Sequence, residues 1–412
     1  MITRYRSEEQ HKEVRQFFDY KDIDYVACWY IIAAKFIQGS NIRVAFVSTN
    51  SITQGEQVAP LWKKLFEDYD IHFDFARRTF RWSSEASDKA HVHCVIIGFS
   101  QTANDSKKII FDGDNVIEAQ NINAYLIDAP DIFIEARSRP LCDVPILTKG
   151  NQPSDGGNLI LSQEERDKLI QDDPGIAQCV RRYIGAKDFI RNDEVRYCLW
   201  LKDIAPGVYA HNREIMRRLK AVQEMRAVST AAPTRAAAEW PYKFFSTPQP
   251  DSLCLCIPRV SSERRKYIPM AFLCENEIAS DSLSIVHGAN LYHFGILTSR
   301  VHMAWIKVIG GRLKSDYRYS GDSVYNNFVW PYPNDKQKSK IESTAQKILD
   351  VRAQFSDSSL ADLYAPLTMP EELLKAHKVN DVAVCEAYGW SKDISEGDIV
   401  AKLFGLYQEF MF

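Results

Sequence analysis

The first 115 residues carry apolar positions in a pattern typical of a mixed α/β fold. Over 56–69 the apolar residues recur at helical spacing, whereas 71–76 and 91–99 are nearly continuous apolar runs of strand length. A further helix is expected at 24–38, apolar almost all round, and a short buried strand at 43–48. The order helix, strand, helix, strand, strand predicts the later half of a doubly wound α/β domain, without its first βαβ units.

Two capping boxes indicate where helices begin. Ser7 and Gln10 open a helix that runs to about residue 18, and Ser162, followed by acids at 164 and 165, opens a helix over 161–172. In a capping box the serine hydroxyl accepts from a backbone N–H of the first turn, which would otherwise have no partner inside the helix.

Prolines and glycines interrupt every periodic pattern from 111 to 157, so this stretch reads as a connector laid across a surface. Beyond it the pattern alternates between strand-like and helical segments, which predicts an α+β region. Strands are expected at 197–201, 252–258, 267–275 and 283–286, and helices at 213–229 and 291–308. After residue 333 three helices are expected, at 336–355, 370–388 and 396–410.

Charge is unevenly distributed, although the 412 residues together carry a net charge of only −3. Residues 181–243 hold 13 Lys and Arg against 7 Asp and Glu, and 256–320 hold 9 against 5, while from 335 onward acids lead by 13 to 9. A basic middle and an acidic end suit an anionic ligand held by the middle. The plain alternative is that such local imbalances arise by chance.

Cysteine usage and the lack of a signal segment in the sequence predict a cytoplasmic protein. The nine cysteines include no CxxC pair and mostly lie in apolar runs, which predicts free thiols. His91 and His93 alternate on an expected strand without a third ligand, so no metal is predicted. The N-terminal residues form no apolar signal segment, and no run reaches the ~18 apolar residues of a membrane span, so no membrane contact is expected.

The most informative segment runs from Gly310 to Ser320, where cations, an acid and tyrosines alternate at one- and two-residue spacing. A buried strand does not normally carry four charged groups in seven residues, so this segment is expected on a surface. Arg and Lys bind phosphates or guanine edges, and Asp accepts from the amino group of cytosine. DNA is therefore the leading candidate for the ligand.

Two further basic–aromatic clusters are candidates for the same ligand. Residues 77–82, Arg-Arg-Thr-Phe-Arg-Trp, follow an expected strand, and open α/β sheets bind ligands at the carboxyl ends of their strands. Residues 258–267 combine four cations with Tyr267, about fifty residues before the main segment. A solvated surface loop is the alternative for each cluster.

Nucleotide-binding and hydrolytic motifs are absent from the sequence. There is no GxGxxG, no GxxxxGK[ST], no GxSxG and no HExxH. A small-molecule enzyme of a common α/β type is therefore disfavoured.

Many separate stretches resemble the MmeI-like, type IIL restriction–modification class of adenine-N6 DNA methyltransferases. The resemblance covers nearly the whole chain. Its early part is carried by 24–30, 44–51, Phe80 and 92–99, which are similar to the later motifs of the methyltransferase domain. Its later part is carried by 127–130, 137–141, 155–159, 183–186, 302–305, 311–320 and 325–331.

This resemblance implies three pieces. Residues 1–115 are similar to the C-terminal part of a class I S-adenosylmethionine-dependent methyltransferase domain, 116–333 to a target recognition domain, and 334–412 to a helical C-terminal domain. The expected fold is thus a partial doubly wound α/β domain, an α+β target recognition domain and a helical domain. Double-stranded DNA is the expected partner.

The chain departs from the family pattern in one respect. The glycine motif that binds S-adenosylmethionine and the catalytic Asn-Pro-Pro-Phe/Tyr loop occur nowhere in the 412 residues. The resemblance therefore implies the C-terminal portion of a longer protein, be it a truncated gene, a split subunit or a fragment. No catalytic residue is expected in this chain, and it is expected not to bind the cofactor alone.

The resemblance also implies roles for individual residues. Phe80 matches the aromatic that stacks on an adenine flipped out of the duplex. Sequence reading is implied for 311–320, and on an extended strand Lys314 and Asp316 share one side, where they can read one G·C pair. DNA contacts are expected from Arg259, Ser261, Ser262, Arg264, Arg265, Lys266, Arg312, Arg318 and Tyr319, with the cations of 259–266 gripping phosphates.

Three functions stay open at this point. The chain is a modification subunit that needs an upstream polypeptide for the missing half, or a DNA-binding remnant without activity. The third, from a different class, is an α/β enzyme acting on a small anion, which requires a closed pocket with a catalytic trio that the sequence does not supply.

Overall fold

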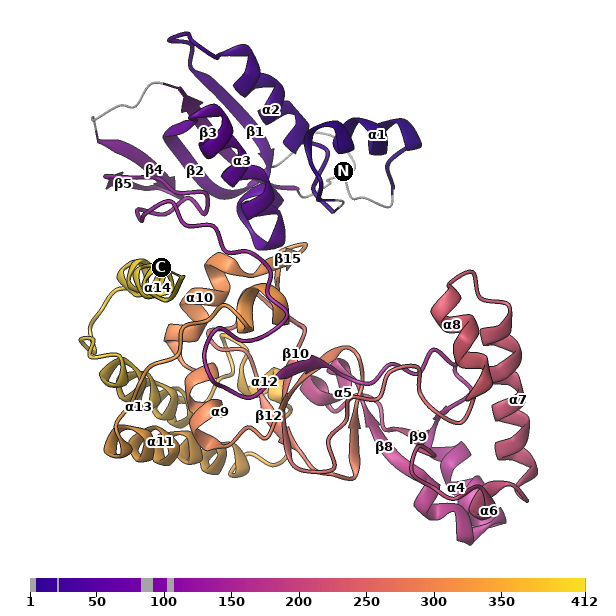
Figure 1. Ribbon diagram of the computed structural model, residues 1–412. Coiled ribbons are helices and arrows are strands. Elements are labelled where there is room, and N and C mark those ends of the chain that lie inside the picture. Colours follow the sequence, from indigo (N-terminus) through magenta and orange to yellow (C-terminus); the bar gives the residue numbers. More distant parts are fainter. Residues whose placement is uncertain (1–4, 21, 83–91, 102–106, 412) are drawn as a thin grey trace. The chain divides into compact units, whose positions relative to one another are not determined.

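The computed structural model describes residues 5–20, 22–82, 92–101 and 107–411, and the chain divides into two compact units (Figure 1). Unit 1 contains Met1–Asp143, Arg300–Tyr332 and Tyr388–Phe412. Unit 2 contains Val144–Ser299 and Pro333–Ala387. Each unit therefore combines stretches that are far apart in the sequence. Among the described residues, no helix has the length and apolar character needed to cross a membrane.

Unit 1 is built on a five-stranded sheet of order β1-β3-β2-β4-β5. Strand β3 is antiparallel to both β1 and β2, β4 is parallel to β2, and β5 returns antiparallel to β4. It follows that β1, β2 and β4 all run in the same direction. The strands are β1 (Val44–Thr49), β2 (His72–Trp82), β3 (Val92–Ser100), β4 (Lys108–Asp112) and β5 (Asn115–Ala119).

Aromatic rings pack helix α2 (Ala27–Phe36) against the sheet. The Tyr30 ring lies 5.1 Å from Trp62 and 5.7 Å from Phe99, and Phe73 closes the cluster at 4.7 Å from Trp62. All four side chains are fully buried, so they form the core of this part of unit 1. Other helices of the unit are α1 (Glu8–Phe17), α3 (Lys64–Tyr69), α10 (Arg300–Ile309) and α14 (Glu396–Met411).

Local sequence signals located several elements correctly. Both predicted capping boxes are present, Ser7 with Gln10 at α1 and Ser162 with Glu165 at α4 (Gln163–Asp172). The helix expected at 56–69 begins instead as short 3-10 and π-helical turns, Gly55–Gln57 and Ala59–Lys63, before α3.

Two expectations for unit 1 differ from the structure, and one element was missed. The strand expected to be buried, β1, is an edge strand with alternate residues exposed. The strand expected at 71–76 extends to Trp82, because residues of 77–82 pair with β3 and Arg77 also pairs with β4. The β4–β5 hairpin was not predicted at all, and its turn uses Gly113 with φ +60.

Unit 2 contains two four-stranded sheets. One has the order β12-β10-β14-β6 and the other β13-β8-β9-β7. The first comprises β6 (Leu147–Lys149), β10 (Cys254–Pro258), β12 (Ala271–Leu273) and β14 (Leu283–His287). The second comprises β7 (Ile160–Leu161), β8 (Val180–Ile184), β9 (Arg196–Leu199) and β13 (Glu277–Ala279).

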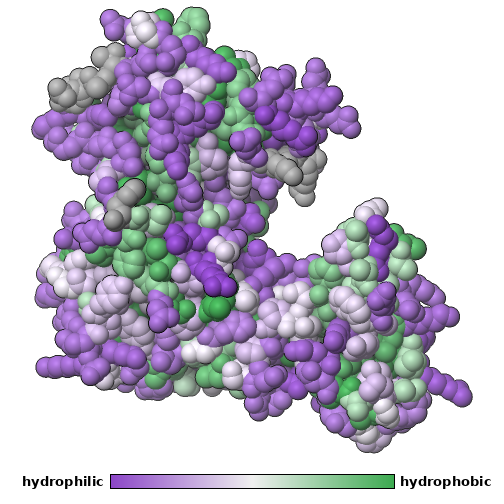
Figure 2. All heavy atoms as spheres, in the orientation of Figure 1, coloured by the Kyte–Doolittle hydropathy of each residue, from purple (hydrophilic) through white to green (hydrophobic). Residues whose placement is uncertain are grey.

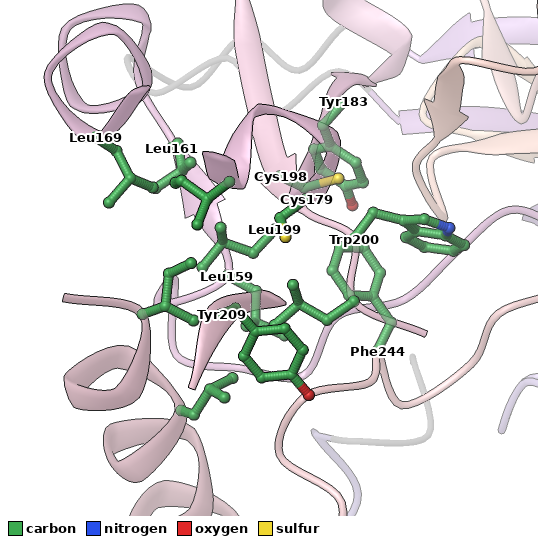
Figure 3. Packing of buried hydrophobic residues seen from close by; sticks show 14 of the residues in the cluster. Leu159, Leu161, Leu169, Cys179, Tyr183, Cys198, Leu199, Trp200, Tyr209 and Phe244 are labelled. Carbon is green, nitrogen blue, oxygen red and sulfur yellow. The ribbon is translucent and has the colours of Figure 1, made fainter. Parts of the chain in front are cut away.

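An apolar cluster packs the second sheet against neighbouring helices and loops (Figure 3). Leu199 and Trp200 from the end of β9 meet Leu159, Tyr209 and Phe244 there. The Trp200 and Phe244 rings lie 5.3 Å apart, edge to face. Helix α7 (Arg213–Ala227), predicted at 213–229, contributes Ile215, Leu219 and Val222 to the cluster.

Helices α11 (Asp335–Ala353) and α13 (Glu371–Ala387) pack together with α9 (Leu291–Leu297) in unit 2. Gly295 permits this approach, since a β-carbon there would lie 2.6 Å from Ile341. The single helix expected at 291–308 is in fact two, α9 and α10, which separate at Thr298 and Ser299 and belong to different units.

Arg226 is a structural residue at the end of α7, although it contributed to the basic balance counted from sequence. Its side chain is fully buried and donates to five backbone carbonyls, those of Pro153, Ser154, Ala237, Trp240 and Lys243, at 2.8–3.2 Å. One charged group thereby ties two stretches of unit 2, 153–154 and 237–243, to the helix.

Replacing Arg226 by alanine is expected to destabilise unit 2 strongly, because it leaves five buried or partly buried backbone carbonyls without their donor. The expected loss of unfolding free energy is on the order of 3 kcal/mol or more, measured by guanidinium denaturation. Lys220→Ala, on the same helix but at an exposed position paired only loosely with Glu224 at 3.9 Å, is the control and should change stability by less than about 0.5 kcal/mol. Equal losses in the two variants would contradict the structural role of Arg226.

Candidate nucleic-acid interface

The segment singled out from sequence forms a β-hairpin in unit 1. Strands β15 (Gly311–Leu313) and β16 (Asp316–Arg318) pair antiparallel, with Leu313 opposite Asp316, so Lys314 and Ser315 form the turn. Lys314 is exposed at the tip and takes a left-handed backbone with φ 59. Asp316 is half-buried and opens the return strand.

This geometry corrects the expectation that Lys314 and Asp316 lie on one extended strand and share a side. The chain reverses between them, so their relation is that of a turn residue and the first residue of the returning strand. Both still lie at the same end of one hairpin. Lysine and aspartate side chains are among the groups that read base edges in the major groove of B-DNA.

Arg312, predicted to contact DNA, braces the hairpin from within. Its guanidinium donates to the backbone carbonyls of Ser315 at 3.3 Å and Lys307 at 3.2 Å. Its guanidinium carbon lies 4.0 Å from the centroid of the buried Tyr317 ring. Arg312 is half-buried by these contacts. It therefore stabilises the conformation of the hairpin.

Tyr319 faces the interior although it was predicted to contact DNA. It is 1% exposed, and its hydroxyl shares a hydrogen bond of 2.8 Å with Nε2 of His302 on α10. His302 is fully buried, with its ring 4.5 Å from that of Phe328. Arg318, between the two inward tyrosines, is exposed. The period-two alternation of a strand thus separates the inward rings from the outward cation.

The hairpin is attached to the N-terminal part of unit 1 through Glu56. The Ser320 hydroxyl donates to one carboxylate oxygen of Glu56 at 3.2 Å, and the Tyr20 hydroxyl donates to the other at 3.2 Å. Burial and the nearby Glu56 charge raise the pKa of Tyr20 to about 12. Gly55 allows the approach, since a β-carbon there would lie 3.1 Å from the Gly311 α-carbon.

Glu56 was missed by sequence reasoning. It lies within an expected helix, where a single acid carries no distinctive signal, and its partners are 36 and 264 residues away. Only the folded chain brings them together.

The cluster at 77–82 divides into structural and exposed members. Arg78 pairs with Asp112 at 2.9 Å and donates to the Leu126 carbonyl at 2.9 Å, which commits it to the fold. Phe80 is half-buried, and the Arg77 guanidinium lies 5.3 Å from its ring centroid. Trp82 is exposed, with its ring 6.2 Å from that of Phe80. Phe80 thus sits in a cation–aromatic group near the end of β2.

A cavity of about 500 Å³ lies in unit 1 between Arg78, Thr79, Lys307, Arg312 and Glu396. Two of its cations have acidic partners, since Arg78 pairs with Asp112 and Lys307 pairs with Glu396 at 2.6 Å. The balanced charges give the cavity no clear preference for an anion.

The second basic cluster belongs to unit 2. Ser261 is buried and accepts from Arg265 at 3.3 Å, and Arg259 donates to the Asp281 carbonyl at 3.2 Å. Arg264 and Lys266 are exposed. The hydroxyl of the half-buried Ser262 accepts from the Arg264 backbone N–H at 3.4 Å. These contacts leave Arg264 and Lys266 as the outward cations of the cluster.

No group of three His, Cys, Asp or Glu side chains able to hold a metal occurs in the part of the chain that the structure describes. Of the two histidines considered from sequence, His91 lies outside that part. His93 is half-buried on β3.

Family models match three successive segments of the chain. A DNA-methyltransferase domain model of MmeI matches residues 2–112, its target recognition domain model 128–332 and its C-terminal domain model 333–412. The chain therefore joins a segment that matches a DNA-methyltransferase domain to a target recognition domain and a C-terminal domain. It belongs to the MmeI-like family of type IIL restriction–modification methyltransferases. The fold class expected from the sequence is thereby confirmed.

Two similar proteins are each longer than this chain. DNA methyltransferase A of Bacillus subtilis (strain 168) is 38% identical over 389 residues, which are 94% of this chain and 44% of the relative. The type IIL restriction–modification enzyme MmeI, solved in complex with DNA, is 42% identical with a TM-score of 0.91, over 100% of this chain and 56% of that one. The chain spans about half the length of these relatives.

Acidification is expected to destabilise unit 1 below about pH 6.5. Burial lowers the pKa of His302 from 6.5 to about 3. Between these values the unfolded chain binds one more proton than the folded chain, so stability falls as the pH falls. This single group accounts for about 2 kcal/mol between pH 6.5 and pH 5. Guanidinium titrations at successive pH values measure the slope.

His302→Gln, which keeps a hydrogen-bonding group beside Tyr319, should flatten that slope without abolishing folding. A slope that stays the same in this variant would contradict the assignment. Imidazole NMR signals give an independent check, since those of His302 should remain neutral at pH 5.

Proposed function

We propose that this chain is the sequence-recognition part of a site-specific adenine-N6 DNA methyltransferase. The observation that carries the proposal is the hairpin tip, where an exposed lysine and a half-buried aspartate lie at one end of strands β15 and β16. Such side chains read base edges in the major groove. The likeness to MmeI, solved in complex with DNA, supports the same assignment. The proposed domain borders remain 115/116 and 333/334.

Base reading is assigned to Lys314 and Asp316. A lysine donates to O6 and N7 of guanine, and an aspartate accepts from N4 of cytosine, so together they discriminate a G·C pair. The hairpin holds the two residues at one tip because Arg312 and the buried tyrosines fix its strands. The outward cations Arg318, Arg264 and Lys266 are assigned to phosphates, where they set affinity without reading sequence.

We assign the methyl-transfer chemistry to residues outside this chain. The glycine motif and the Asn-Pro-Pro-Phe/Tyr loop do not occur in these residues, so the chain does not fit S-adenosylmethionine by itself. We assign it no cofactor contact and no catalytic residue. Methylation then requires an upstream polypeptide that supplies the missing half. The second candidate is a DNA-binding remnant without methyltransferase activity. The absent motifs favour this candidate if no polypeptide supplies the missing half.

Exchanging the charges at the tip is expected to change the recognised base pair. The chain selects duplexes from a random library, and the enriched sites are sequenced. Lys314→Glu combined with Asp316→Arg should invert or abolish the preference at one G·C position, at a cost of about 1–3 kcal/mol, and leave the other positions intact. If the double variant selects the same DNA site as the parent chain, Lys314 and Asp316 do not read that base pair.

The matched control is Arg264→Gln with Lys266→Gln. It should weaken binding to all sequences alike and reduce the slope of log affinity against log salt by about 2. If the unaltered chain shows no salt-dependent binding to DNA, the proposed function itself is wrong.

Phe80 is assigned to stacking on the flipped adenine. In an enzyme reconstituted with the missing half, Phe80→Ala should reduce the 2-aminopurine fluorescence change at the target base. The loss of about 1–3 kcal/mol of stacking should favour the base inside the duplex. Phe80→Tyr keeps the ring and should retain the signal. The same fluorescence change with alanine and with phenylalanine would count against the assignment.

A further inference from the structure

Leu313 is an exposed apolar side chain at the tip of the hairpin formed by β15 and β16. It is 56% exposed and directly precedes Lys314, the cation of the turn. Hydrophilic residues cover most of the molecular face drawn in Figure 2. Single exposed leucines are nevertheless common on protein surfaces, so exposure alone gives Leu313 no role. The groups beside it on the hairpin decide what it can contact.

The register of the hairpin places Leu313 on the same face as Asp316. The two residues are directly opposite each other, and the side chains of opposite residues in an antiparallel pair lie on one face. Arg318 follows Asp316 by two residues along β16 and therefore shares this face. Leu313 and Arg318 are exposed and Asp316 is half-buried, so this is the outward face of the hairpin.

The other face of the hairpin is committed to the fold. Arg312 is opposite Tyr317 in the register, and its guanidinium carbon lies 4.0 Å from the centroid of that ring. Tyr317 is only 5% exposed. Because neighbouring residues of a strand alternate between the two faces, this packing fixes Leu313 on the outward face beside Asp316. An apolar group and a carboxylate are thus held next to each other.

The chemistry of the major groove limits what a leucine can recognise there. The base edges present ring nitrogens, carbonyl oxygens and amino groups, with which leucine forms no hydrogen bond, and one apolar group, the C5-methyl of thymine. Cβ atoms of opposite residues lie about 4.5–5.5 Å apart, whereas successive bases of one strand are about 3.4 Å apart. When Asp316 accepts from a cytosine amino group, Leu313 is therefore spaced for a neighbouring base and not for the same cytosine.

We propose that Leu313 is a specificity-determining residue that contacts the methyl group of a thymine in the base pair next to the G·C pair read by Lys314 and Asp316. The contact excludes water from that methyl group, and no other base of unmodified DNA offers one. This proposal rests on the proposed function and extends the site read by the hairpin by one base pair.

The test replaces thymine by deoxyuridine, which removes the methyl group and keeps the hydrogen-bonding edge of the base. The site is first defined by selecting duplexes from a random library with the full 412-residue chain. It should contain a thymine adjacent to the G·C position that the exchange of Lys314 and Asp316 alters. The parent chain should bind the duplex with deoxyuridine there about fourfold more weakly, which is the effect of losing one buried methyl group. Deoxyuridine outside the selected site should have no effect.

Variants at position 313 connect the methyl effect to this side chain. Leu313→Ala should bind the thymine and deoxyuridine duplexes equally. Leu313→Met keeps an apolar side chain of similar volume and should retain most of the difference between the two duplexes. Leu253→Ala is the matched control, because Leu253 of unit 2 is 51% exposed, and it should leave the difference unchanged. All variants should keep the circular dichroism and thermal midpoint of the parent, because the changed side chains are exposed.

Three results would each overturn the role of Leu313. They are a selected site without thymine beside the G·C position, equal affinity of the parent chain for the two duplexes, and a difference between the duplexes that persists in Leu313→Ala. If Leu313→Ala instead weakens binding to both duplexes alike, the side chain acts as a wedge between bases and not as a reader of the methyl group. A parent chain that keeps its G·C preference in any of these results leaves the proposed function standing. A parent chain without salt-dependent DNA binding removes the proposed function and the Leu313 contact together.

Discussion

The hydrogen bond between Tyr319 and His302 holds the hairpin on which the proposed DNA recognition depends. Tyr317 beneath Arg312 and Tyr319 beside His302 bury the inward side of the second strand and the residue just after it. A slip of one residue would expose both rings and bury Arg318, so the register is strongly specified. The presentation of Lys314 at the tip is therefore a consequence of packing in the core, not of the charged residues themselves.

Charge counted along a sequence does not equal charge available at a surface. Arg226 is enclosed by five carbonyls, and Arg218 is buried and donates to Glu165 at 2.7 Å and Glu214 at 2.8 Å. Arg312 serves the hairpin in a similar way. The basic balance of 181–243 therefore owes part of its value to structural arginines. In the range 256–320 as well, the outward cations, such as Arg264 and Lys266, are fewer than the number of Lys and Arg residues suggests.

Local signals could be predicted from the sequence, whereas contacts between distant segments could not. The capping boxes at Ser7 and Ser162 depend only on residues within one helical turn and are where they were expected. The shared side assigned to Lys314 and Asp316 assumed an extended chain, and the left-handed Lys314 reverses it. The break between α9 and α10 contains neither glycine nor proline, so no breaker signal marked it. The role of Glu56 needs Ser320, which no local pattern connects to it.

Unit 1 brings distant parts of the sequence into one compact body. It contains residues from all three matched segments: the methyltransferase part, the hairpin of the target recognition part and the last helix of the C-terminal part. Gly55 and Glu56 touch the hairpin only a few residues after β1 ends. The sheet and the hairpin that presents Lys314 and Asp316 therefore belong to the same packed body. Side-chain packing within one compact unit, and not a flexible linker, therefore fixes where the hairpin lies relative to the sheet.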